Sequence, residues 1–236
     1  MSTPDVHTVR VPRTARVATL GTPATAPTWW VALHGYGQLA TDVLEPFAAV
    51  AGPERAVLAP EALSRFYVDD LETHEQVGAS WMTRVARTAE IADYVDYLDA
   101  VVRRLRPDHG RPRAAGEEDV SGRRPDGTAP SIRVLGFSQG AATASRWALL
   151  GDTAVDRLVL WGGAPAHDLD LEAHAERLRA MDLTLIVGTE DPYVTDERRA
   201  AARRRLARPD IPVTVRTFEG GHRLDDDTLR AVVGAA

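Results

Sequence analysis

The sequence contains no cysteine, which excludes every function that requires a thiol. Disulfide scaffolds, thiolate zinc sites and a cysteine nucleophile all depend on this side chain. The chain also lacks an uninterrupted apolar run close to the roughly 20 residues that a membrane-spanning helix needs. We therefore expect neither a disulfide-stabilised protein nor a protein that inserts stably into a membrane.

A concentrated positive charge is missing as well. The 28 basic residues are outnumbered by 34 acidic ones, which gives a formal net charge of −6, whereas nucleic-acid binding usually needs a basic surface. Residues 1–16 mix proline, arginine, aspartate and histidine and lack the apolar centre of a secretion signal. These features predict a cytoplasmic protein without a nucleic-acid partner.

Strand and helix patterns alternate along the chain, whose 236 residues suit a single domain spanning 1–236. This alternation is typical of the α/β class, in which helices cover both faces of a mostly parallel central sheet. We predict strands at 28–33, 56–59, 131–137, 157–161, 183–187 and 213–218, and extended chain over 9–20. We predict helices at 42–51, 89–105, 139–150, 169–179, 195–207 and 225–233.

Two connecting segments limit what else the fold can contain. Residues 106–130 are crowded with Arg, Gly, Pro, Asp and Glu, so they cannot bury enough apolar surface to offset the entropy lost on ordering. We predict a flexible surface insertion there. Residues 163–182 suffice for one helix but not for a separate cap domain, so the expected site is open or shallow.

The strongest local motif is Gly-Phe-Ser-Gln-Gly at 136–140, a G-x-S-x-G pattern between a predicted strand and a predicted helix. A serine at so sharp a turn exposes its hydroxyl above the edge of the sheet, and the flanking glycines avoid side-chain collisions. The motif predicts that Ser138 is a nucleophile. The alternative is a tight turn with an incidental serine.

A serine hydroxyl needs a base that removes its proton, usually a histidine oriented by a carboxylate. His222 fits best among the seven histidines, because it follows the last predicted strand and two glycines. The carboxylate is expected after the strand at 183–187, where Glu190 and Asp191 compete. We favour Asp191 for its shorter side chain, although Asp before Pro is also a common turn pair without chemistry.

Acyl transfer also needs donors that stabilise the oxyanion. In this arrangement they are the backbone N–H of the residue after the nucleophile and an N–H of a loop after an early strand. The first is that of Gln139, and the second lies in His-Gly-Tyr-Gly at 34–37, where we select Tyr36. His-Gly-x-Gly alone is a weak signal, but it gains weight beside G-x-S-x-G.

Together these segments resemble the phospholipase/carboxylesterase family of α/β-hydrolases, which includes the acyl-protein thioesterases. The matching patterns are L-H-G-x-G at 33–37, G-F-S-Q-G at 136–140, G-x-x-D-x-x-V at 188–194 and G-H at 221–222. The resemblance extends from about residue 28 to the C-terminus. It implies an α/β-hydrolase fold, a catalytic triad of Ser138, Asp191 and His222, oxyanion donors at Tyr36 and Gln139, and no cofactor.

The chain departs from the family pattern at two points. The family commonly has an aspartate where this chain has Gln38, and the 106–130 insertion is longer than the usual connection. Residues 65–84 look like those of little-characterised bacterial esterases of this group, which argues against assuming a protein-depalmitoylating role. No reacting group is lost, but the substrate cannot be carried over.

The expected activity is hydrolysis of a small-molecule carboxylic ester or thioester through an acyl-enzyme. As candidates to line the substrate groove we choose Trp81, Met82, Trp161 and Tyr193, with the alternative that each is an ordinary core residue. Arg84 is either a contact for an anionic substrate or a solvated surface residue. Acyl-chain length, oligomeric state and ester against thioester preference stay open.

Other functions compete with this one. The same triad serves hydrolases of lactones or carbon–carbon bonds and perhydrolases, and a hydrolase fold can also serve as a non-catalytic binding protein. A metal-dependent hydrolase is disfavoured, because no His and Asp residues have metal-ligand spacing. We therefore expect no metal.

Overall fold

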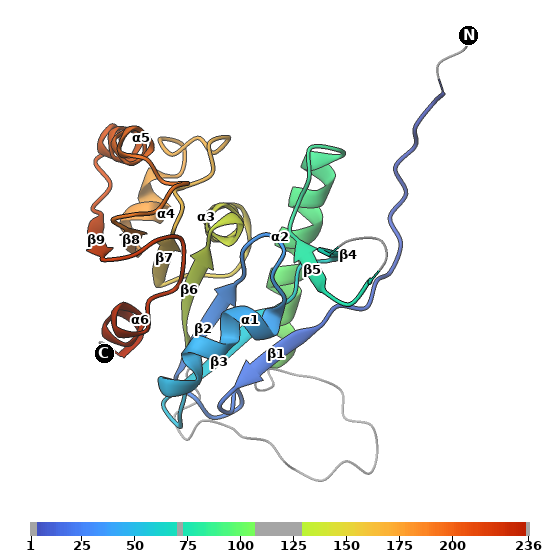
Figure 1. Ribbon diagram of the computed structural model, residues 1–236, viewed down its shortest axis with the longest axis horizontal. Coiled ribbons are helices and arrows are strands. Elements are labelled where there is room, and N and C mark those ends of the chain that lie inside the picture. Colours follow the sequence, from blue (N-terminus) through green and yellow to red (C-terminus); the bar gives the residue numbers. More distant parts are fainter. Residues whose placement is uncertain (1–3, 70–72, 107–128, 235–236) are drawn as a thin grey trace.

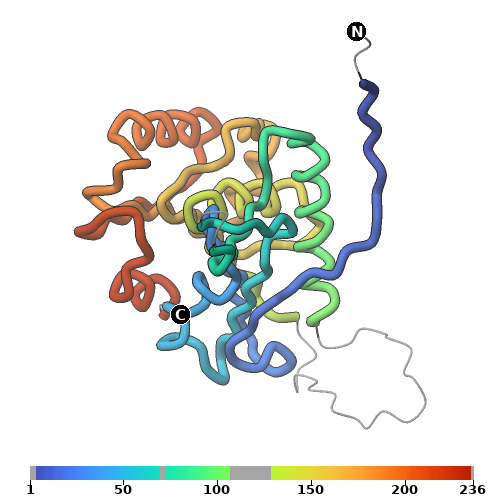
Figure 2. The backbone as a smooth tube through the Cα atoms, turned by 45° about the vertical axis from the view of Figure 1, so that its right-hand side comes forward, coloured from blue at the N-terminus to red at the C-terminus, as the bar shows by residue number. Residues whose placement is uncertain are grey.

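The computed structural model describes residues 4–69, 73–106 and 129–234. The predicted insertion at 106–130 lies, for residues 107–128, outside the described residues. In Figures 1 and 2, residues 4–16 run as an extended segment that leads away from the rest of the chain. No helix within the described ranges combines the length and the apolar character needed to cross a membrane.

A seven-stranded sheet forms the centre of the molecule, with strand order β1-β3-β2-β6-β7-β8-β9 (Figure 1). Only β1 runs antiparallel to its neighbour, and the other neighbouring pairs are parallel. The strands are β1 Val17–Leu20, β2 Thr28–Leu33, β3 Arg55–Pro60, β6 Ser131–Phe137, β7 Arg157–Trp161, β8 Asp182–Gly188 and β9 Thr214–Phe218. The predicted mostly parallel sheet is confirmed.

Helices cover both faces of this sheet, because its central strands are apolar on both sides. Alternate residues of β2 point to opposite faces: Trp29 lies in one core cluster and Trp30 in the other. The first face is covered by α2 Arg87–Leu105, α3 Gln139–Leu150, α4 Ala175–Arg179 and α5 Asp196–Ala207. The second is covered by α1 Ala40–Leu44, the 3₁₀ helix η1 Glu45–Ala49 and α6 Asp226–Gly234.

Three local features differ from what the sequence predicted. The helix expected at 42–51 is α1 followed by the 3₁₀ helix η1, which has a proline in its first turn and so lacks one backbone N–H. The helix expected at 169–179 forms only from Ala175, because the Asp170 carboxylate accepts the N–H groups of Glu172 and Ala173 in a turn. The third is an antiparallel hairpin, β4 Ser64–Tyr67 and β5 Val77–Ser80, that the pattern did not predict.

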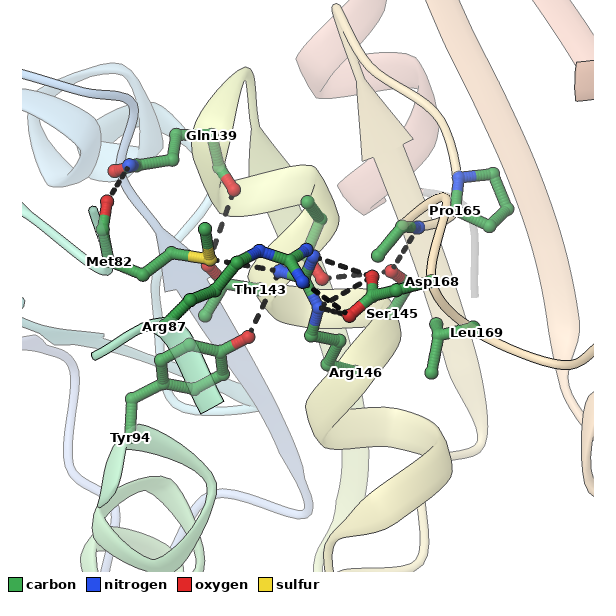
Figure 3. Close-up of polar contacts among 12 residues, drawn as sticks. Met82, Arg87, Tyr94, Gln139, Thr143, Ser145, Arg146, Pro165, Asp168 and Leu169 are labelled. Atoms are coloured by element: carbon green, nitrogen blue, oxygen red, sulfur yellow. Dashed lines mark hydrogen bonds and ion pairs between the residues drawn. The ribbon is translucent and has the colours of Figure 1, made fainter. Parts of the chain in front are cut away.

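A buried arginine joins three of these elements. Figure 3 shows the Arg146 guanidinium of α3 in contact with the Asp168 carboxylate, at 2.7 Å from Nη2 and 3.1 Å from Nε. Its Nη1 donates to the hydroxyl of Tyr94 in α2 at 3.1 Å, and Arg87 adds a second ion pair to Asp168 at 3.2 Å. The cluster ties α3, which begins at Gln139, to α2 and to the segment after β7.

We predict that Asp168→Ala lowers the free energy of unfolding by about 3 kcal/mol, because it leaves the buried Arg146 guanidinium without its carboxylate. Chemical denaturation followed by tryptophan fluorescence measures this loss. Asp96→Ala is the matched control, since Asp96 and its partner Arg10 are both more than half exposed and such pairs contribute less than about 1 kcal/mol. Equal losses in the two variants would contradict the structural role of Asp168.

The same pair makes stability depend on pH. Burial alone would raise the pKa of Asp168, but hydrogen bonds from Arg146 and Arg87 outweigh burial and hold that pKa well below its usual range. A carboxylate with a lowered folded-state pKa stabilises the fold above its unfolded pKa of about 4, and the contribution disappears as the pH falls through the folded value. The difference in unfolding free energy between the wild type and Asp168→Ala should therefore be complete near about pH 6 and shrink below about pH 4. A difference that stays constant over this range would argue against the ion pair.

Candidate active site

Ser138 occupies the turn between the end of β6 and the start of α3. Its φ of 55° and ψ of −116° are strained for a residue with a side chain. The turn is sharp enough that a Cβ on Gly140 would lie 2.2 Å from the carbonyl oxygen of Leu33. The N–H of Ser138 donates to the carbonyl of Trp161 at 2.8 Å, which fixes the turn to β7. The strain points the serine side chain out over the carboxyl edge of the sheet.

Three side chains from three loops form one hydrogen-bonded row at this edge. The Ser138 Oγ lies 2.8 Å from His222 Nε2, and His222 Nδ1 lies 2.7 Å from Asp191 Oδ2. His222 follows β9 and Asp191 follows β8. Because the carboxylate can only accept a hydrogen bond, Nδ1 carries the proton and Nε2 is left to accept the serine O–H.

The carboxylate at the end of the row is buried and fully engaged. The side chain of Asp191 is 1% exposed, and its Oδ1 accepts the backbone N–H groups of Tyr193 at 2.8 Å and Val194 at 3.2 Å. Its neighbour Glu190 is exposed and donates only its backbone N–H, to Gly220. Of the two candidate acids, Asp191 is the one that contacts the imidazole.

Aromatic rings hold the imidazole from two sides. The ring centre of Phe137 lies 4.9 Å from that of His222, and Tyr193 meets it edge-on at 4.8 Å. The backbone of Gly162, at the end of β7, passes below the ring with a φ of +59°. Gly162 was not among the sequence candidates, because a glycine after a strand most often serves only to turn the chain.

The two expected oxyanion donors are not used by the described part of the fold. Neither the Tyr36 N–H nor the Gln139 N–H donates to another described residue, and the N–H of Gln139 belongs to the first turn of α3, which leaves it without a helical partner. The loop that carries Tyr36 packs against the nucleophile, since a Cβ on Gly35 would lie 3.3 Å from the Ser138 Cβ. Gln38, the departure from the family pattern, accepts the Gly35 N–H at 2.8 Å and so tightens this loop.

A buried histidine fixes the same loop from below. His34 Nε2 accepts the N–H of Ala62 at 3.0 Å, so the proton sits on Nδ1, which donates to the carbonyl of Gly35 at 2.7 Å. Burial lowers the pKa of His34, and its hydrogen bond to Gly35 opposes this only in part. A neutral imidazole is therefore built into the support of the Tyr36 loop. The sequence showed this residue only as part of a glycine motif.

The side chain of Gln139 attaches the hairpin to the nucleophile turn. Its Oε1 accepts the N–H of Trp81 at 3.0 Å, and its Nε2 donates to Ser80 Oγ and the Met82 carbonyl at 3.1 Å each (Figure 3 includes the contact with Met82). Its amide therefore fixes the position of the segment after β5.

Two of the four groove candidates are in the wrong place for substrate contact. Trp81 is 3% and Trp161 is 1% exposed, and their indole N–H groups donate to the carbonyls of His34 and Arg223. Both are core residues, because they fill space beneath the loops. Met82 is half-buried against Arg146. Tyr193 is 63% exposed beside His222.

A cavity of about 340 Å³ opens next to Ser138 and His222. Its wall is made by the segment after β7, by β8 and β9, and by α5. The exposed Arg84 does not line it. Within the described ranges no three His, Asp or Glu side chains group in a way that could hold a metal ion.

Solved structures with the same architecture include esterases and a thioesterase. The crystal structure of esterase PE8 superposes with a TM-score of 0.64 at 21% identity, over 94% of this chain and 97% of that one. Acyl-protein thioesterase 2 of Zea mays gives 0.65 at 16% identity, with the same shares of each chain. A carboxylesterase from Mesorhizobium loti gives 0.62 at 19% identity over 94% of each chain. No protein-family model and no curated protein matches the sequence.

Similarity at this level of identity establishes the fold. The strand order, the strained serine between β6 and α3 and these superpositions together give the chain the α/β-hydrolase fold.

We predict that Gly162→Ala disrupts the row without unfolding the protein. The new Cβ would lie 2.8 Å from His222 Cε1 and 3.1 Å from Nδ1, so the imidazole must shift away from Ser138 or Asp191. A misplacement of about 1 Å can lower reactivity about 100-fold. The measurement is the rate at which a fluorophosphonate labels Ser138.

Gly52→Ala is the matched control for this substitution, because a Cβ on Gly52 meets no atom within 4 Å. The fluorophosphonate should label this variant at the wild-type rate. Wild-type labelling of Gly162→Ala would mean that the backbone at β7 does not position His222.

Proposed function

We propose that this protein is a serine hydrolase that cleaves carboxylic ester or thioester bonds, and that it belongs to the phospholipase/carboxylesterase group of α/β-hydrolases. The observation that carries the proposal is the continuous hydrogen-bonded row from Ser138 through His222 to the buried Asp191. The esterase and thioesterase neighbours support the same activity.

The first half of the reaction forms an acyl-enzyme. Ser138 Oγ attacks the carbonyl carbon while His222 Nε2 takes its proton, and Asp191 stabilises the imidazolium that results. The oxyanion accepts hydrogen bonds from the free N–H groups of Tyr36 and Gln139. The carbon–oxygen or carbon–sulfur bond then breaks, and the proton on Nε2 passes to the leaving alcohol or thiol.

The second half releases the acid. Water loses a proton to His222 Nε2 and attacks the acyl-enzyme, and the same two N–H groups stabilise the second oxyanion. Ser138 leaves with the proton held on Nε2, which restores the starting row. The reaction uses no metal or cofactor, since every proton and electron pair is accounted for by ester, water and these side chains.

Lactone hydrolysis, carbon–carbon bond hydrolysis and perhydrolysis use the same triad and remain the competing reactions. A panel of p-nitrophenyl esters of graded acyl length, their thioester counterparts and a set of lactones separates these reactions. We expect the highest kcat/KM for an ester or thioester. Preference for a lactone would reassign the reaction while leaving the nucleophile in place.

We predict that Ser138→Ala abolishes both ester hydrolysis and fluorophosphonate labelling, because the proposed acyl-enzyme forms on the Ser138 hydroxyl. Ser131→Ala is the control: Ser131 contacts Asp156 at the opposite end of β6, so both activities should stay at wild-type values. Labelling that survives Ser138→Ala would refute the assignment of the nucleophile.

We predict that Asp191→Asn lowers kcat by about 10⁴-fold with the fold intact, because an amide favours the wrong histidine tautomer. Glu190→Gln is its matched control, since Glu190 is exposed and its side chain does not contact His222. If kcat fell only in Glu190→Gln, Glu190 and not Asp191 would be the acid that orients His222.

A further inference from the structure

The cavity beside Ser138 has one apolar wall and one basic wall. Its sheet side consists of hydrophobic side chains from β8 and β9, namely Leu185, Ile186, Val187 and Val215. Its opposite side is α5, which contributes the small Ala202 and three arginines, Arg198, Arg199 and Arg203. No Asp or Glu side chain lines it. A molecule that fills this space therefore meets apolar surface along its body and positive charge along one side.

The arginines lie beside the buried side of α5, where the helix borders the cavity. Ala202 and Leu206 are buried and mark the side of α5 that faces the sheet. Arg199, which is half-buried, and Arg203, which is exposed, are spaced i, i+4 and so lie one turn apart on α5 beside Ala202. Both side chains can therefore reach the edge of the cavity while their guanidinium groups stay partly in solvent.

The three arginines differ in how much of their charge is already compensated. Arg199 pairs with Asp196, and Arg198 donates to the carbonyl of Tyr193 at 2.6 Å. The Arg203 side chain forms no ion pair or hydrogen bond with any residue in the part of the chain that the structure describes. The Asp191 carboxylate already accepts hydrogen bonds from His222 and from two backbone N–H groups. Because a carbonyl is neutral, Arg198 and Arg203 both leave positive charge uncompensated at this wall, and Arg203 is the one whose side chain has no partner among the described residues.

The position of the cavity decides which part of the substrate enters it. His222 lines the cavity, whereas neither Tyr36 nor Gln139, the residues with the free N–H groups, does so. A leaving group must lie next to His222 Nε2 to receive its proton. The cavity is therefore on the leaving-group side of Ser138, and the acyl group is directed toward the opposite side.

We propose that the preferred substrates carry an anionic group, such as a carboxylate, on the alcohol or thiol that is released, and that Arg203 recognises it. This inference rests on the proposed function and specifies its substrate class. The apolar wall takes the body of the leaving group, and Arg203 takes its charged end. The Arg203 guanidinium acts on the substrate and not on the triad.

A pair of acetate esters tests the proposal with one change of charge. The anionic member is 4-acetoxybenzoate and the neutral member is 4-acetoxybenzamide, which has the same shape. Each kcat/KM is divided by the rate constant of alkaline hydrolysis of that ester, which removes the difference in intrinsic reactivity. The corrected ratio of anionic to neutral substrate should exceed 1 in the wild type and fall as ionic strength rises.

Substitution of the arginine identifies the source of the preference. Arg203→Gln should lower the ratio roughly fivefold, the size expected for one partly solvated ion pair, and Arg203→Glu should bring it below 1. Arg204→Gln is the matched control, because the exposed Arg204 is on the same helix but does not line the cavity. A wild-type ratio in both Arg203 variants would overturn the proposal.

A second pair of substrates tests on which side of the scissile bond the charge is recognised. The p-nitrophenyl monoester of succinate places the carboxylate on the acyl group, and p-nitrophenyl butyrate is its neutral partner. If Arg203→Gln reduced the preference for the succinate ester instead, the assignment to the leaving group would be wrong. Failure of the proposed function itself looks different, because Ser138→Ala would then retain hydrolysis of the neutral esters.

Discussion

The structure depends on one geometric constraint: three side chains far apart in the chain must meet within hydrogen-bonding distance. His222 is separated from Asp191 by 31 positions and from Ser138 by 84. A parallel sheet meets this constraint because all its strands present their carboxyl ends at the same edge. β6, β8 and β9 each supply one member of the row, and β7, which lies between β6 and β8, supplies the glycine over which the imidazole rests.

Hydrogen-bonded polar groups support that edge from behind. His34 fixes the Tyr36 loop, the Gln139 amide fixes the segment after β5, and the Arg146–Asp168 pair holds α3 against α2 and the segment after β7. Each of these groups is positioned behind the reacting atoms and has its own hydrogen bonds satisfied within the protein. Preorganisation of this kind is what lets backbone N–H groups stabilise a developing charge without first having to rearrange.

Much of the fold follows from local pattern. Long apolar runs such as 131–137 and 183–187 predict buried parallel strands, and both become strands with nearly the expected bounds. The β4–β5 hairpin is missed because each strand has only four residues: β4 alternates between partly buried and exposed positions, and β5 is mostly small buried residues. The turn at Asp170 is missed because a side-chain hydrogen bond overrides the helical pattern.

Part of the candidate site could also be predicted from local sequence, and part could not. The G-x-S-x-G motif and the order of the loops single out Ser138, Asp191 and His222, and the structure brings these side chains into one row. The groove residues could not be chosen from sequence, because an aromatic side chain after a strand is as suitable for the core as for a substrate. Trp81 and Trp161 went to the core. The arginines of α5 also carry no motif, and only the cavity reveals which of them face the site.

The central claim is that Ser138 becomes acylated during turnover. The most direct measurement is to quench the wild type with acid during steady-state hydrolysis of a p-nitrophenyl ester and to locate the added acyl mass by peptide mapping. The account predicts the acyl group on the peptide that contains Ser138, at the mass of the ester's acid minus water. An acyl group on another residue, or turnover with no acylated peptide in a quench that preserves acyl-serine standards, would contradict it.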